Sequence, residues 1–238
     1  MERNELVLAR LSNQYLLRTG ERMEVLRAMN GFQAQFLSNA LYAMRLRSTA
    51  YDTAHAADSL VKSWTLRGTM HIFAETDLPL FLHTGCRYRS RDWTVPSFWN
   101  QRPDWALTPQ RQAYFSDLIV DALAQGPMTR EALKARCRAA GMTQAEEGSI
   151  FHPWGGGIRE LCERGFLCGT VSEEKAFRLC PAFTPMEEQD ALLEQTRRYF
   201  TNYGPASIRD AAYYFGSSQA EIKKRLARLP MKEAAYEG

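Results

Sequence analysis

The amino-acid sequence predicts a mainly α-helical protein with short β-hairpins, built as tandem winged-helix modules of the helix-turn-helix type. Each of three stretches contains two or three helical segments, followed by residues with the pattern of short strands. A weak internal repeat supports a tandem arrangement. GPMTREAL at Gly126 and GPASIRDA at Gly204 both place a hydroxyl residue between a Gly-Pro pair and a charged helical start.

The first module is assigned to residues 1–85, and its helical part shows an amphipathic pattern. The expected helices span residues 5–17, 21–28 and 35–46. Gly20 and the Asn30-Gly31 pair separate these helices, because glycine and asparagine favour the turns at which helices end. The module therefore begins with three short helices in succession.

One further helix and one strand are expected to complete the first module. Asp52 is the expected cap of this helix. The helix is expected to bury Leu60, Val61 and Trp64. Residues 64–73 then alternate between apolar and polar, as a strand does. One face of this strand would hold Leu66, Met70 and Ile72, and the other Arg67, Thr69 and His71.

Residues 108–185 form the expected second module, and residues 186–238 the start of a third. In the second module we expect helices near Thr108, Thr129 and His152, followed by two short strands around a polar turn. In the third, a Ser-Ser turn joins SIRDAAYYFG to the basic QAEIKKRLARL, as in a helix-turn-helix. The final MKEAAYEG predicts the first strand of a wing. Because one strand cannot fold alone, we expect the chain to be a fragment of a longer protein.

Composition and charge exclude several classes of protein. The chain has 238 residues, of which 45% are hydrophobic and 24% charged, and its net charge is +3, as in an ordinary globular protein. No apolar run is long enough to span a bilayer. Charged residues occupy the N-terminus, where a secretory signal needs an apolar stretch. We therefore expect a soluble, cytoplasmic protein with no membrane partner.

Neither a metal site nor a disulfide framework is expected. The cysteines form no C-x-x-C pair, and the four histidines form no ligand cluster. The cysteines are Cys86, Cys137, Cys162, Cys168 and Cys180. The run of three glycines from Gly155 lacks the strand before it and the lysine after it that a phosphate-binding loop requires. We interpret this run as a flexible helix start and expect no cofactor.

The segment between the first two modules, residues 86–107, is rich in arginine and aromatic residues. Its core reads RYRSRDWTVPSFWNQRPDW, from Arg87 to Trp105. Arginine mixed with aromatic rings suits contact with phosphates and stacking on bases. Tryptophans that fill a crevice between modules produce the same composition. The sequence leaves both interpretations open.

The most specific feature of the chain is a pair of glutamines, Gln33 and Gln35, just after Gly31. Two positions apart, they would diverge on a regular helix but point the same way in an extended segment. Carboxamides do not titrate, so they can orient a water molecule but cannot act as general acid or base. Such a site suits hydrolysis with a good leaving group, such as a cationic N-alkylated purine. The alternative is a pair of solvent-exposed glutamines without a function.

The chain resembles the AlkZ/YcaQ group of winged-helix DNA glycosylases over nearly its whole length. GFQAQFLSNALYAMRLR, from Gly31, is similar to that group's catalytic Gln-apolar-Gln motif. DSLVKSWTLRGTMHIF, from Asp58, and the tandem winged-helix modules are the other similar features. A sister branch has aspartate at the second position of the motif. With Gln35 there, the chain resembles the AlkZ branch, which unhooks interstrand crosslinks.

The resemblance implies that Gln33 and Gln35 are catalytic. From the residues themselves, we expect a DNA-facing set around this pair. Its members are Arg45, Arg47, Arg67, Thr69 and His71. For Arg67, Thr69 and His71 the alternative is a solvated strand face. For Arg45 and Arg47 the alternative is that they are ordinary surface arginines.

The implied function is DNA repair by a monofunctional N-glycosylase. It would hydrolyse the N-glycosidic bond of purines alkylated at N7 or N3. The same activity would extend to the unhooking of interstrand crosslinks. No lysine lies beside the glutamine motif to form a Schiff base. The expected partner is double-stranded DNA with alkylated bases or crosslinks, bound by a monomer on the bacterial nucleoid. Because the family continues past this chain's end, we expect the missing part to affect activity. A non-enzymatic DNA-binding protein and an inactive fragment are the alternatives.

Overall fold

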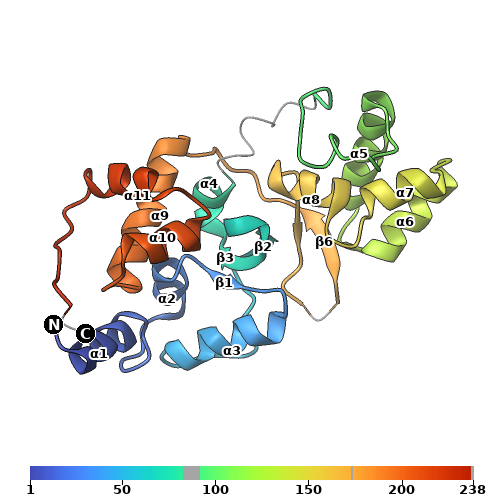
Figure 1. Ribbon diagram of the computed structural model, residues 1–238. Helices are drawn as coiled ribbons and strands as arrows, with labels where there is room; N and C mark the ends of the chain where they lie inside the picture. Colours follow the sequence, from blue (N-terminus) through green and yellow to red (C-terminus); the bar gives the residue numbers. More distant parts are fainter. Residues whose placement is uncertain (83–91, 173, 237–238) are drawn as a thin grey trace. The chain divides into compact units, whose positions relative to one another are not determined.

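A computed structural model describes residues 1–82, 92–172 and 174–236 of the protein. These residues form two compact units, each with its own core (Figure 1). Unit 1 consists of residues 1–60, 65–82 and 184–236, and unit 2 of residues 61–64, 92–172 and 174–183. The predicted first and third modules therefore contribute to the same unit.

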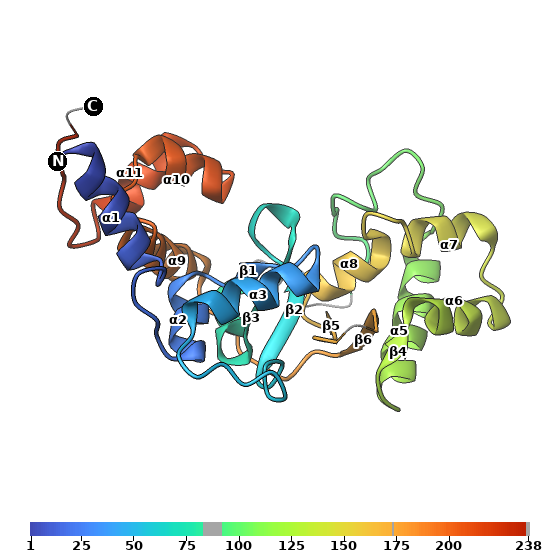
Figure 2. The ribbon, with the colours of Figure 1, turned by 90° about the horizontal axis from the view of Figure 1, so that it is seen from below.

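Unit 1 combines two helix-rich parts of the chain. Its elements from the first part are α1 (Arg3–Asn13), α2 (Arg22–Ala28), β1 (Phe32–Gln33), α3 (Leu37–Arg47), the 3-10 helix η1 (Leu66–Gly68), β3 (Met70–Ala74), the 3-10 helix η2 (Glu75–Asp77) and α4 (Leu78–Phe81). Its elements from the second part are α9 (Glu188–Asn202), α10 (Ile208–Phe215) and α11 (Gln219–Leu226). Figure 2 shows α2, α3 and β1 as neighbours in this unit.

A two-stranded antiparallel ladder joins β1 to β3. Phe32 lies opposite Ile72, and Gln33 lies opposite His71. Phe32 and Ile72 are both buried. Gly31, which enters the ladder, has φ +75°, and a Cβ atom on it would lie 2.5 Å from the Ile72 carbonyl oxygen. Only glycine therefore allows the chain to enter β1 this close to β3.

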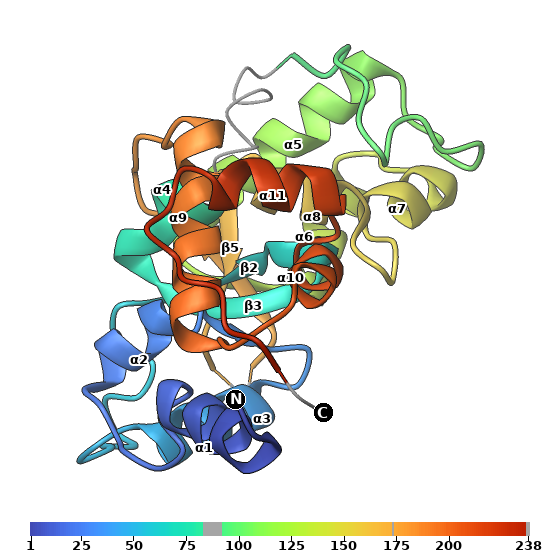
Figure 3. The same ribbon diagram turned by 60° about the vertical axis from the view of Figure 1, so that its left-hand side comes forward.

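Helix α9 ties the two parts of unit 1 together, and Figure 3 shows it beside α4. The guanidinium of Arg198 forms an ion pair with Asp77 at 2.6 Å. The side chain of the buried Gln195 donates from Nε2 to the Leu80 backbone carbonyl at 2.8 Å. The backbone carbonyl of Gln195 accepts from Asn30 Nδ2 at 3.0 Å. These buried polar contacts fix α9 against the elements that carry β1 and β3.

Unit 2 has the order of elements of a winged helix. Its elements are β2 (Leu60–Trp64), α5 (Pro109–Leu123), β4 (Met128–Thr129), α6 (Arg130–Ala139), α7 (Gln144–Ile150), α8 (Gly156–Glu163), β5 (Leu167–Gly169) and β6 (Ala176–Leu179). Strands β5 and β6 form the predicted hairpin, and β4, between the first two helices, pairs with β6. In unit 1, β1 likewise lies between two helices, α2 and α3, and pairs antiparallel with β3. The predicted fold class, mainly α with short β-hairpins in winged-helix modules, is confirmed.

The glycine run begins α8 without forming a phosphate loop. Gly156 has φ +60°, and a Cβ atom there would lie 2.2 Å from the Ser149 carbonyl oxygen. Gly155, Gly156 and Gly157 are all buried. The glycines therefore allow α8 to start in contact with the end of α7, and they are rigid packing positions rather than a flexible start.

The predicted helix capped by Asp52 is wrong. Residues 53–59 form turns, and Leu60 to Trp64 form strand β2. Ser59 adopts the left-handed conformation, with φ 58°, which interrupts a helix at that point. Because Val61 and Trp64 favour strands, the chain then continues in extended form.

The single strand predicted over residues 64–73 is also wrong, because η1 interrupts it. The turn is closed by the Thr65 N–H, which donates to the Thr69 carbonyl at 3.1 Å. Arg67 and Gly68 both have positive φ angles, 54° and 65°. Leu66 therefore lies in a turn rather than on a strand face.

At the C-terminal end, residues 231–236 have no regular secondary structure, so the strand predicted there is wrong for these residues. The N-terminal amine of Met1 donates to the Ala235 carbonyl at 2.8 Å.

Among the described residues, no helix is long and apolar enough to cross a membrane. The same residues contain no group of three or more His, Cys, Asp or Glu side chains that could hold a metal ion.

Candidate active site

Gln33 ends strand β1, and Gln35 lies in the bend that follows it. The Ala34 N–H donates to the Met70 carbonyl at 2.7 Å, which continues the β1–β3 ladder beyond Gln33. Ala34 is only 1% exposed, whereas both glutamines are exposed. The alternation of exposed Gln33, buried Ala34 and exposed Gln35 places both carboxamides on the solvent side of this segment.

Strand β3 and the residue before it bring two further polar side chains to this face. His71 lies opposite Gln33, and the same register, continued through Ala34 and Met70, places Thr69 opposite Gln35. Side chains directly opposite each other in an antiparallel pair share a face. We call the cluster of Gln33, Gln35, Thr69 and His71 the glutamine face.

His71 is a neutral group on the glutamine face. Its ring is buried, and its Nδ1 lies 3.0 Å from the Thr69 carbonyl oxygen. A carbonyl only accepts, so Nδ1 carries the proton and Nε2 remains an acceptor. Burial lowers the pKa of His71 to about 4, and the charge of Arg67 acts in the same direction, against the Thr69 hydrogen bond. The ring is therefore uncharged at neutral pH.

Arg67 stands at the end of the ladder, in the turn before Thr69. Its side chain is exposed, and its guanidinium carbon lies 5.5 Å from the centre of the Tyr214 ring of α10. Burial raises the pKa of Tyr214 well above its ordinary value, so this ring stays protonated. A cation over the face of an aromatic ring is held without losing its charge. The sequence analysis did not identify Tyr214. The run of three aromatic residues at positions 213–215 was the feature that could have indicated it.

The two arginines of α3 differ in their surroundings. Arg45 is exposed, and its side chain forms no hydrogen bond or ion pair with any described residue. Arg47 turns inward: its Nε donates to the Gln14 carbonyl at 3.0 Å and its Nη1 to the Ala43 carbonyl at 2.9 Å. Its guanidinium also lies 5.6 Å from the centre of the Phe32 ring. Arg45 is available to a phosphate, whereas Arg47 holds β1 and α3 in place.

One exposed aromatic side chain beside the glutamines was not singled out from the sequence. Phe36 directly follows Gln35 and is 68% exposed. Apolar rings of this size are usually buried, so an exposed one next to polar site residues is informative. Such a ring can stack on a nucleic-acid base.

The arginine-aromatic segment is only partly described, because residues 87–91 lie outside the described residues. Trp93 and Trp99 are 4% and 3% exposed, respectively, within unit 2. Arg102 forms an ion pair with Asp104 at 2.8 Å. For these two tryptophans the packing interpretation is therefore the better one, and their rings are not available to stack on DNA.

Comparison with known proteins identifies the family to which the chain belongs. A protein-family model described as "DNA glycosylase AlkZ-like" matches residues 26–235. This range includes both glutamines and most of the chain, and the protein therefore belongs to the AlkZ-like DNA glycosylase family.

Two relatives come from Streptomyces sahachiroi. An interstrand DNA cross-link repair glycosylase is 29% identical over 202 residues, covering 78% of this chain and 52% of the relative. The solved structure of DNA glycosylase AlkZ superposes with a TM-score of 0.71 at 23% identity, covering 97% of this chain and 66% of that one. The fold is shared over nearly all of this chain, which spans about half the length of the curated relative.

The buried His71 predicts a specific dependence of stability on pH. Its pKa is about 4 in the folded protein and near 6.5 in the unfolded chain, which therefore binds the extra proton between these values. We expect this residue to lower the free energy of unfolding by up to about 3 kcal/mol as the pH falls from 6.5 to 4. Urea unfolding of the protein and of His71→Gln at several pH values measures this contribution.

The variant is expected to lose less stability than the parent protein across that pH range. His55→Gln serves as the control: the hydrogen bond to Asp58 raises the pKa of this exposed histidine, so the variant should lose at least as much stability as the parent protein as the pH falls. Equal losses in the parent and in His71→Gln would show that His71 does not titrate in this way.

Proposed function

We propose that the protein is a DNA glycosylase that hydrolyses the N-glycosidic bond of purines alkylated at N7 or N3. The observation that carries this proposal is the pair of outward-facing carboxamides, Gln33 and Gln35, on one face of a short ladder beside a neutral histidine. Membership of the AlkZ-like family and the names of the similar proteins from Streptomyces sahachiroi support the same chemistry.

The reaction matches what uncharged groups can do. Alkylation at N7 or N3 makes the purine cationic, so the base leaves as a neutral molecule with the electron pair of the broken C1′–N bond. A water oxygen forms the new bond to C1′, and the water proton passes to solvent. We assign Gln33 and Gln35 to hold that water and to direct their carbonyl oxygens at the oxocarbenium-like sugar. Neither carboxamide changes its protonation state.

His71 supports this arrangement from the opposite strand. Protonation would place a positive charge on the face where the sugar becomes positive, and its low pKa prevents this. Its Nε2, an acceptor, is directed to the same face as Gln33 by the strand register. We assign His71 to position Gln33 or the attacking water, and Thr69 to hold the ring through its carbonyl.

Unhooking of interstrand crosslinks follows from the same chemistry. A crosslink through the N7 atoms of two purines contains two cationic bases, and release of either one separates the strands. The name of the Streptomyces relative, an interstrand cross-link repair glycosylase, supports extending the substrate class in this direction.

A monofunctional mechanism is part of the proposal. The first lysine of the chain is Lys62, so no lysine occurs in the segment with the glutamines. Without a lysine in this segment, the reaction is proposed to form no Schiff base with the sugar and to leave an intact abasic site. Sodium borohydride should therefore trap no covalent protein–DNA complex.

The experiment is to incubate the chain with a duplex that contains one N7-methylguanine and to analyse the products. The proposal predicts free 7-methylguanine and an abasic strand that breaks only after alkali treatment. A parallel reaction with a nitrogen-mustard crosslink should yield separated strands. If the protein binds these duplexes but releases no base, it is a non-enzymatic DNA-binding protein and the proposed chemistry is wrong.

Arg45 and Arg67 are proposed to contact DNA phosphates at the edges of the glutamine face. Arg45→Gln should weaken binding to all duplexes by a similar factor and reduce the slope of log K against log salt by about 1. Fluorescence anisotropy at several salt concentrations measures both quantities.

Arg3→Gln, an exposed arginine of α1, is the matched control and should leave the slope unchanged. Equal slopes for Arg45→Gln and the parent protein would remove Arg45 from the DNA contact set.

A further inference from the structure

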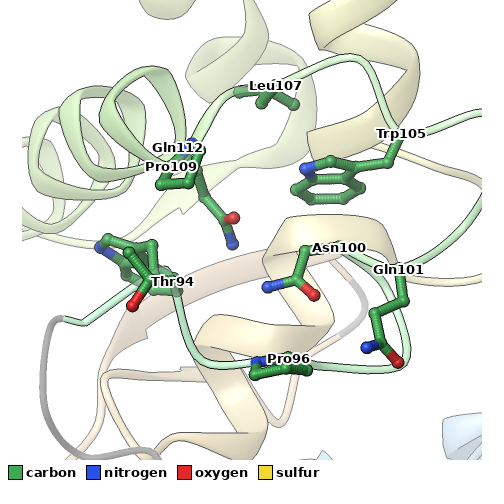
Figure 4. Close-up of a pocket in the computed structure, with 9 residues that line it drawn as sticks. Thr94, Pro96, Asn100, Gln101, Trp105, Leu107, Pro109 and Gln112 are labelled. Carbon is green, nitrogen blue, oxygen red and sulfur yellow. The ribbon is translucent and has the colours of Figure 1, made fainter.

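Unit 2 contains a cavity that the proposed chemistry does not use. Its volume is about 240 Å³. The lining residues that matter here are Trp93, Asn100, Gln101, Trp105 and Gln112. Figure 4 shows the Trp105 ring along one side and the Gln112 carboxamide pointing into the space. We call this cavity the base pocket.

A buried network holds one wall of the base pocket rigid. The Arg164 guanidinium carbon lies 4.2 Å from the centre of the Trp93 ring. Glu160 binds Arg164 Nη2 at 2.6 Å through Oε1 and accepts from Gln112 Nε2 at 2.8 Å through Oε2. Arg164, Glu160 and Gln112 are all between 2% and 3% exposed, so the network is shielded from water.

The network also fixes which polar atom of Gln112 is free. A carboxylate accepts only, so the contact with Glu160 requires the Gln112 nitrogen on that side. The Gln112 oxygen is then on the other side of the amide, at the pocket (Figure 4), and none of the hydrogen bonds found among the described residues ends on it. A nearly fully buried carboxamide with an unpartnered acceptor at a cavity is a feature of a binding site.

The chemistry of the walls indicates a flat, nitrogen-rich ligand. The half-buried Trp105 offers aromatic surface, and Gln112 offers an acceptor for an N–H donor. Gln101 is exposed at the rim and can adapt to the ligand, whereas Asn100 is held by the Val95 carbonyl at 2.9 Å. A volume of about 240 Å³ is below the roughly 300–1,000 Å³ of pockets for drug-sized molecules, so a single bicyclic ring fits better than a whole nucleotide.

We infer that the base pocket binds a purine base through stacking on tryptophan and a hydrogen bond from its exocyclic amine to Gln112. The base is either a free purine or one displaced from a DNA strand, and both present the same ring to the pocket. This inference depends on the residues of unit 2 alone and does not require the glutamine chemistry.

Isothermal titration of the full chain with adenine tests the inference, with unsubstituted purine as the matched ligand that lacks the exocyclic amine. We expect one site per chain, with purine binding about tenfold more weakly than adenine. Trp105→Ala should weaken adenine binding by about tenfold or more, and Trp105→Phe should restore most of it. Trp154→Ala, which removes a 74% exposed tryptophan outside the pocket, should have no effect.

The two sources of the base are separated with a single-stranded oligonucleotide of adenines and an abasic strand of the same length. A displaced base is the source if Trp105→Ala weakens binding of the adenine strand but not of the abasic strand. A free base is the source if only adenine itself shows this dependence. The inference is overturned if Trp105→Ala, folded by circular dichroism, binds adenine and the adenine strand as the parent protein does, or if the parent binds neither.

Discussion

Replacing either Gln33 or Gln35 by alanine is expected to lower the rate of 7-methylguanine release by about 100- to 1,000-fold. This is the loss usually found when one preorganised hydrogen-bonding group is removed from a charged transition state. Both side chains are exposed and make no described hydrogen bond, so their removal leaves the fold intact. Single-turnover release from a methylated duplex measures the effect, because it excludes product dissociation.

Gln144→Ala is the matched control for this prediction. Gln144 is also exposed and lies at the start of α7 in unit 2, away from the glutamine face. Its replacement should leave the rate unchanged. Full activity in both Gln33→Ala and Gln35→Ala would show that the carboxamides do not take part in the reaction.

A second large effect is expected from Gly31→Ala. The new Cβ atom would lie 2.5 Å from the Ile72 carbonyl oxygen, at a φ of +75° that side chains other than glycine disfavour. The left-handed conformation alone costs about 1–2 kcal/mol, and β1 must also move away from β3. Since a displacement of about 1 Å can reduce catalysis about 100-fold, we expect base release to fall by that factor, together with a lower free energy of unfolding.

Gly141→Ala separates strain from displacement. Gly141 also has a positive φ, +82°, but its Cβ position has no atom within 4 Å. In this variant the free energy of unfolding should fall by about the cost of the left-handed conformation alone, as estimated for Gly31→Ala, and activity should be retained. If Gly31→Ala retained full base release, the position of β1 against β3 would not matter for the reaction.

Much of the site was predictable from the sequence because its pattern is local. Gly31 followed by two glutamines two residues apart indicated an extended segment, and the structure shows Ala34 buried between them. The hydroxyl residues of the internal repeat were also informative, since Thr129 and Ser207 accept hydrogen bonds at the starts of α6 and α10.

The errors arose where long-range packing outweighs local preference. Residues 52–64 contain enough helix-forming residues to resemble a helix, yet Leu60, Val61 and Ser63 are all buried and lie in a strand. The inward turn of Arg47 depends on the Gln14 carbonyl, far away in the sequence. The sequence offered no signal for either contact. For Tyr214 the aromatic run was visible in the sequence, but its position against Arg67 is non-local.

We propose that Gln33 and Gln35 act together on one water molecule at an alkylated purine. The direct test is the single-turnover rate of 7-methylguanine release by the parent protein, the two single alanine variants and the double variant, with DNA binding measured in parallel. The account predicts release by the parent protein and a double variant about as slow as the slower single variant, because groups that act as a unit are not additive. Unchanged release in the double variant, or DNA binding by the parent protein without any release, would contradict it.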